Sequence, residues 1–156
     1  MRILGIDPGY ERIGIAVLDK IEGKETLVYS TCFKTLSTLE FEQRLVLIAL
    51  EIDRVITEYK PDVLAIEKLF FDRNTTTALK VSEAKGVITQ EAKQAGLRVY
   101  EYTPLQIKVA ATGYGKASKE DVRKMVPLLL KGVDVSKKID DEVDAIAIAL
   151  TGSASI

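Results

Sequence analysis

The sequence contains no histidine and only one cysteine, Cys32. The absence of histidine excludes Ser-His-Asp triads, Cys-His dyads, HExxH zinc sites and any imidazole general base. A single cysteine allows no intrachain disulfide and no cysteine-rich metal site, which fits a reducing compartment.

Long apolar runs are also missing, since none approaches the roughly 18 residues that a membrane-spanning helix needs. The first residues, MRILGIDPG, lack the apolar core and cleavage site of a signal peptide. We therefore expect a cytoplasmic protein with no membrane partner. Its 156 residues, 47% of them hydrophobic and 29% charged, are typical of one globular domain spanning 1–156.

Charge is unevenly distributed, although the net charge of −1 gives no overall indication of nucleic-acid binding. Residues 108–138 contain eight Lys or Arg and three acids, and Asp140, Asp141, Glu142 and Asp144 follow directly. A solvated helix face also explains the basic stretch. The direct succession of a basic stretch and an acidic cluster is the first indication of a functional site.

Apolar periodicity predicts an α/β fold with a mixed five-stranded sheet flanked by helices. Strands are expected at 2–6, 12–18, 26–33, 63–66 and 97–102, and helices at 38–59, 75–95, 104–111, 119–131 and 141–151. Short turns between the first three strands predict an antiparallel meander, and the later alternation of helix and strand predicts parallel pairing. Ser37 with Glu40, and Ser118 with Asp121, have the spacing of helix capping boxes.

Two segments, ILGID at 3–7 and VLAIE at 63–67, are continuous apolar runs that end in an acid. Such runs are typical of central strands that are buried on both faces. Asp7 and Glu67 are then expected at the carboxyl ends of central strands, where open α/β sheets bind ligands. Turn chemistry at Asp7-Pro8-Gly9, or a strand simply meeting water, is the alternative explanation.

A third acidic feature opens the predicted helix DDEVDAIAIAL at 140–150. Asp141 and Asp144 are three residues apart and face the same way on a helix, either as capping residues or toward the core. If they converge with Asp7 and Glu67, like charges about 5 Å apart repel by about 3 kcal/mol at an effective dielectric of 20. A cation would offset this repulsion, and oxygen ligands alone select Mg²⁺ or Mn²⁺.

Five segments in order resemble the RuvC family of crossover-junction endodeoxyribonucleases. They are GIDPG (5–9), AIEKLFF (65–71), TTTALKVSEAKGV (75–87), TPLQIKVAATGYGKASKEDVRKMV (103–126) and DEVDAIAIA (141–149). The resemblance implies an RNase H-like fold and a homodimeric, Mg²⁺-dependent endonuclease of DNA recombination and repair. Such an enzyme binds four-way (Holliday) junctions and nicks two strands symmetrically.

The resemblance also implies a catalytic and metal-binding set of carboxylates: Asp7, Glu67, Asp141 and Asp144. They would hold Mg²⁺, or Mn²⁺ in its place, with two ions in each active site. Paired ions of this kind activate water and stabilise the leaving oxygen in phosphodiester hydrolysis.

Residues for handling DNA are implied in the same way: Lys108, Lys116, Lys119 and Phe70. Lys108 and Lys119 match family lysines, Lys116 lies beside the G-Y-G segment at 113–115, and Phe70 matches an aromatic that engages a base at the crossover. Ordinary surface charge explains the lysines equally well, and Phe70 or Phe71 is expected in the core. Helix 75–95 matches the dimer helix, and a branch-migration helicase complex (RuvA/RuvB) would be the cellular partner.

Two other functions remain open, and a third is discounted. A YqgF-like RNase H-fold nuclease acting on RNA would use the same carboxylates, and a non-catalytic junction-binding protein would not need them. A sugar-kinase or actin-like ATPase shares the GIDPG opening, but it requires two such domains, and this chain is too short and has no Walker motif.

Overall fold

The computed structural model describes residues 1–70 and 75–156. Within these ranges the strands are β1 (Arg2–Asp7), β2 (Arg12–Ile21), β3 (Lys24–Lys34), β4 (Val63–Glu67) and β5 (Arg98–Tyr102). The helices are α1 (Phe41–Tyr59), α2 (Thr75–Gln94), α3 (Pro104–Thr112), α4 (Lys119–Leu129) and α5 (Asp140–Ser155). None of these helices is long and apolar enough to cross a membrane.

The five strands form one sheet in the order β3-β2-β1-β4-β5. The pairs β1–β2 and β2–β3 are antiparallel, whereas β1–β4 and β4–β5 are parallel, so the predicted mixed sheet is confirmed. The parallel register places Ile6 opposite Ile66. Asp7 and Glu67 follow this pair directly and therefore lie at the same edge of the sheet.

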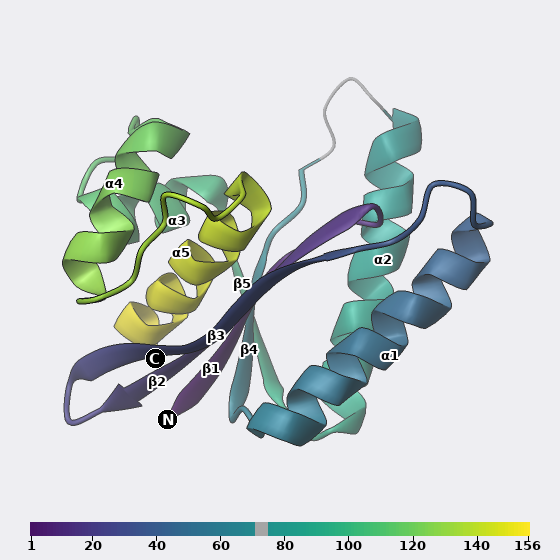
Figure 1. The fold of residues 1–156 in the computed structure, drawn as a ribbon, viewed down its shortest axis with the longest axis horizontal. Helices are drawn as coiled ribbons and strands as arrows, with labels where there is room; N and C mark the ends of the chain where they lie inside the picture. Colours follow the sequence, from purple (N-terminus) through teal and green to yellow (C-terminus); the bar gives the residue numbers. More distant parts are fainter. Residues whose placement is uncertain (71–74) are drawn as a thin grey trace.

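Helices cover both faces of the sheet, with α1 and α2 on one face and α3, α4 and α5 on the other (Figure 1). This three-layer arrangement buries the central strands from both sides, because Leu4 and Leu64 on one face and Ile3 and Ala65 on the other are all fully inaccessible to solvent. The continuous apolar runs before Asp7 and Glu67 are explained by this double burial.

Helix α5 approaches β1 and β2 so closely that two sheet positions require glycine. A Cβ atom at Gly5 would lie 2.7 Å from the Cβ atom of Ala149, and one at Gly14 would overlap the backbone oxygen of Asp141. Because Gly14 pairs with Asp7 across β1 and β2, this contact places the first turn of α5 beside the end of β1.

One of the two predicted capping boxes is wrong. Ser37 lies in a turn, and α1 begins three residues later than expected for that box, with a reciprocal hydrogen-bond pair between Glu40 and Gln43. The other box is confirmed, because the Ser118 side chain accepts a hydrogen bond from the Asp121 backbone at the start of α4.

Replacement of Gly14 by alanine tests the close packing of α5. The added methyl group has no space, and overpacking of this kind costs about 1–3 kcal/mol, so we expect a loss of unfolding free energy at the upper end of that range. Gly86→Ala is the matched control, since a Cβ atom there meets nothing within 4 Å. Urea denaturation measures both variants, and equal stability of Gly14→Ala and the unmodified protein would contradict the packing described.

Candidate active site

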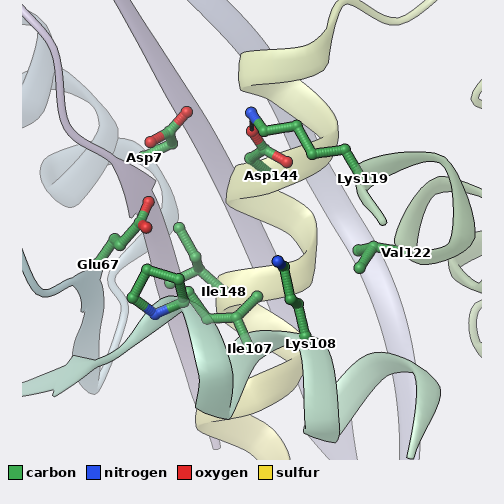
Figure 2. A pocket seen from close by; sticks show the side chains of 9 residues that line it. Asp7, Glu67, Ile107, Lys108, Lys119, Val122, Asp144 and Ile148 are labelled. Atoms are coloured by element: carbon green, nitrogen blue, oxygen red, sulfur yellow. Dashed lines mark hydrogen bonds and ion pairs between the residues drawn. The ribbon is translucent and has the colours of Figure 1, made fainter. Parts of the chain in front are cut away.

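Three carboxylates from three different elements line one pocket of about 130 Å³. Asp7 ends β1, Glu67 ends β4, and Asp144 lies in α5, which crosses the sheet at this point (Figure 2). The remaining lining residues are two lysines and a set of mainly apolar side chains: Lys108, Lys119, Pro104, Ile107, Val122 and Ile148.

Burial and mutual repulsion of the carboxylates determine the electrostatics of this pocket. Loss of solvent raises the pKa of Asp7 to about 8, and the neighbouring carboxylates of Asp144, Glu67 and Asp141 add to the effect. Burial and Asp144 also raise the pKa of Glu67. Each carboxylate thus makes ionisation of the next less favourable.

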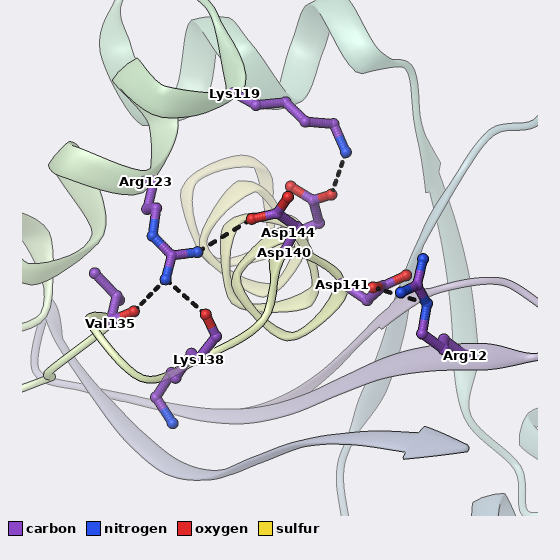
Figure 3. Close-up of polar contacts among 8 residues, drawn as sticks. All are labelled: Arg12, Lys119, Arg123, Val135, Lys138, Asp140, Asp141 and Asp144. Carbon is purple, nitrogen blue, oxygen red and sulfur yellow. Dashed lines mark hydrogen bonds and ion pairs between the residues drawn. The ribbon is translucent and has the colours of Figure 1, made fainter.

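Basic residues hold the acids at the start of α5 in separate places (Figure 3). Three of the ion pairs there join Lys119 Nζ to Asp144 Oδ2 at 2.8 Å, Arg12 Nε to Asp141 Oδ2 at 3.5 Å, and Arg123 to Asp140 at 3.2 Å. The hydrogen bond to Asp144 is the main reason that the pKa of Lys119 is raised.

The predicted carboxylate quartet is divided between two adjoining hollows. Asp141 does not line the pocket of Asp144 but a neighbouring hollow of about 220 Å³, and Asp7 lines both. As the side chains stand, no group of three or more acids in the described ranges is arranged to hold one metal ion. Lys119 and Arg12 occupy carboxylate oxygens of Asp144 and Asp141, and the assignment of all four acids as ligands stays a prediction.

The other predicted residues take different positions. Lys108 and Lys119 line the pocket, whereas Lys116 is exposed in the connection between α3 and α4 and does not. Phe70 follows β4 and is 62% exposed, and Phe71 lies outside the described residues. Their roles in DNA binding stay predictions.

Two arginines at the site were missed by sequence reasoning. Arg12 pairs with Asp141, and Arg123 donates hydrogen bonds to Asp140 and to the backbone oxygens of Val135 and Lys138. The excess of basic residues at 108–138 was a usable signal for Arg123. Arg12 lies far from Asp141 in sequence, and only the packing of α5 against β2 brings the two together.

The strand order is typical of an RNase H-like protein. So is the position of the acids, at the ends of the two central parallel strands and on the helix that crosses them. A family model described as "Crossover junction endodeoxyribonuclease RuvC" matches residues 3–152. The chain belongs to this RuvC family.

Individual relatives agree with that assignment. A RuvC protein from Desulfitobacterium hafniense is 44% identical over 156 residues, covering 100% of this chain and 94% of the relative. One from Caldicellulosiruptor saccharolyticus is 44% identical over 151 residues, covering 96% and 90%. The solved structure of T. thermophilus RuvC in complex with Holliday junction substrate matches with a TM-score of 0.89 at 36% identity, covering 97% of this chain and 92% of that one.

Replacement of Asp7 by asparagine tests the charge in the pocket. With a pKa of about 8 in the folded state against 3.8 ordinarily, Asp7 keeps a proton that the unfolded chain releases, so stability falls as the pH rises from about 4 to 8. Without metal, the unfolding free energy of Asp7→Asn should therefore exceed that of the unmodified protein by about 2–5 kcal/mol at pH 8. The two unfolding free energies should converge near pH 4.

Chemical denaturation in EDTA at several pH values measures this difference. Glu22→Gln, in the exposed turn between β2 and β3, is the control, and its unfolding free energy should equal that of the unmodified protein at every pH. If the curve for Asp7→Asn is parallel as well, the carboxylates do not repel one another as described.

Proposed function

We propose that this protein is an endonuclease that resolves Holliday junctions, hydrolysing phosphodiesters of four-way DNA by paired symmetric nicks. Family membership over nearly the whole chain supports the substrate, as does the close match to a relative whose structure contains a junction. The observation that carries the chemistry is the meeting of Asp7, Glu67 and Asp144 in one pocket with two lysines. Residues 1–156 would form one nuclease domain.

The donor set fits a hard divalent cation, because it offers carboxylate oxygens and the chain contains no histidine. Asp7, Glu67 and Asp144, with Asp141 from the adjoining hollow, would hold Mg²⁺ or Mn²⁺, two ions in each site. Bound ions would activate a water molecule and stabilise the leaving oxygen. Burial and the neighbouring carboxylates disfavour the ionised form of Asp7, and a bound cation would stabilise that form.

Basic and aromatic side chains near the pocket would position the DNA. Lys108 and Lys119 project into the pocket from α3 and α4 and would neutralise phosphate charge beside the scissile bond (Figure 2). Lys116 would add a further phosphate contact from the neighbouring connection. Phe70, exposed just after Glu67, would stack on a base at the crossover.

Single replacements of the pocket acids test the catalytic role. Asp7→Asn, Glu67→Gln and Asp144→Asn should each slow cleavage of a synthetic four-way junction by more than about 100-fold, because loss of a metal ligand costs at least as much as loss of a supporting residue. Binding of the junction should stay equal or become tighter, since the lost carboxylate repels phosphate. Gel-based cleavage with Mg²⁺ and with EDTA measures the rates.

Glu22→Gln, in the exposed turn between β2 and β3, should cleave at the unmodified rate. Full activity of Asp7→Asn would refute the catalytic assignment. Preferential cleavage of structured RNA would favour a YqgF-like nuclease, and tight junction binding without cleavage in any metal would favour a non-catalytic binding protein.

The outer surface of α1 and α2 would form the homodimer interface, centred on the helix at 75–95. Leu79 on α2 is 54% exposed, and Val46 and Leu50 on α1 are 58% and 61% exposed. The spacing of Val46 and Leu50 places them on one stripe of α1. Together they give the helical layer that lies away from the carboxylate pocket an apolar outer surface.

Leu79→Glu should convert the dimer into a monomer, because the interface would bury a charge without a partner. Leu128→Glu is the control, since Leu128 is 70% exposed on α4, on the other face of the sheet. Sedimentation velocity at micromolar concentration measures the mass. A dimer that survives Leu79→Glu would place the interface elsewhere.

In the cytoplasm, a branch-migration helicase complex (RuvA/RuvB) would supply the junction.

A further inference from the structure

A basic hollow of about 350 Å³ lies apart from the carboxylate pocket, between the end of β3 and the first turns of α1. Its lining consists of three cations, one acid and small or apolar residues: Arg12, Lys34, Arg44, Glu11, Thr35, Leu36 and Ser37. Arg12 also lines the hollow that contains Asp7 and Asp141. Glu11 lines both hollows as well, so the two are connected along the surface through these two residues.

Two of the cations are direct neighbours on adjacent antiparallel strands. The antiparallel register of β2 and β3 pairs Arg12 with Lys34. Like charges in directly opposed positions destabilise a sheet. Asp141 offsets part of this repulsion through its contact with Arg12 at 3.5 Å, but it lies in the other hollow. A bound anion would remove the rest.

The third cation, Arg44, is buried and incompletely paired. Only 6% of the residue is exposed, and its Nε atom has no hydrogen-bond partner among the described residues. Its guanidinium lies 5.8 Å from the centre of the Tyr10 ring, and its ion pair with Glu11 is long, at 3.8 Å. A buried charged donor without an acceptor is rare in proteins, and an anion beside the guanidinium would offset this incomplete pairing.

We propose that this hollow binds a phosphate group of the DNA backbone, with Arg44, Lys34 and Arg12 as its ligands. Arginine matches phosphate geometry well, because its planar fork donates several parallel hydrogen bonds. Three cations exceed the single carboxylate of Glu11, whose side chain is 63% exposed and free to turn away. The choice of DNA as the source rests on the proposed function, since a strand over Asp7 and Asp141 reaches the hollow along Arg12.

Charge reversal at Lys34 tests the site without disturbing the core, which a change at the buried Arg44 would risk. Lys34→Glu should bind a four-way junction about tenfold more weakly near 0.1 M salt, and the slope of log K against log salt should decrease by about one. Lys24→Glu is the matched control, because Lys24 is exposed at the other end of the same strand. It should leave affinity and slope unchanged.

Inorganic phosphate distinguishes a backbone phosphate from a free anion. We expect it to shift the ¹⁵N–¹H resonance of Arg44 Nε saturably, and to do so much more weakly in Lys34→Glu. If phosphate shifts the Arg44 resonance but the Lys34→Glu and Lys24→Glu variants bind the junction equally well, the hollow binds a free anion and the DNA assignment is overturned. No shift and equal affinities would overturn the site altogether. An unmodified protein that does not bind junctions would instead refute the proposed function, and the phosphate titration alone would then decide whether the hollow binds anions.

Discussion

Helix α5 lies close against β1 and β2 because glycine and alanine residues form the contact. The geometry of the carboxylate pocket depends on this short distance between helix and sheet. Gly5 and Gly14 leave room for the backbone of the helix, and Ala145 and Ala149 face them. Larger residues would move the helix outward, since packed interiors leave no free volume for them. Asp141 and Asp144 would move with it, away from Asp7. Residues with no chemistry of their own therefore decide whether the acids meet.

This meeting stores unfavourable electrostatic energy in the folded chain. The pKa of Asp7 is raised because the folded state both removes its water and surrounds it with other carboxylates. Lys119 and Arg12 offset part of the charge through Asp144 and Asp141. Active sites commonly sacrifice stability in this way, and the proposed cation would relieve the repulsion. Two of the four acids would exchange an ion pair within the protein for a metal ligand when the cation binds.

The sequence was sufficient for the parts of the fold that follow from apolar patterns. The runs before Asp7 and Glu67 identified two neighbouring central strands, because only strands covered on both faces are apolar at every position. The start of α1 was placed wrongly because Ser37 and Glu40 have capping spacing, and the competing Glu40–Gln43 pair is formed instead. Local spacing alone cannot choose between two such pairs, since the choice depends on where the chain leaves β3.

The site was predictable in composition but not in detail. Residues three apart on a helix are separated by about 60° around its axis, so Asp141 and Asp144 share a face in a broad sense only. Their neighbours, Arg12 from β2 and Lys119 from α4, draw them into different hollows, and those neighbours are set by tertiary structure. The burial of Arg44 was equally hidden, because an arginine in an amphipathic helix is ordinarily expected in solvent.

The distribution of charge around the pocket explains how a chain with a net charge of −1 would hold a polyanion over a cluster of acids. Carboxylates repel the phosphates that they must act on, so a strand has to be attracted by groups beside the pocket. Lys108 and Lys119 supply positive charge from the side of α3 and α4. Arg12, Lys34 and Arg44 supply it from the side of β2, β3 and α1. In the proposed complex, backbone contacts on both sides would fix position rather than sequence, and the phosphate between them would be presented to Asp7, Glu67 and Asp144.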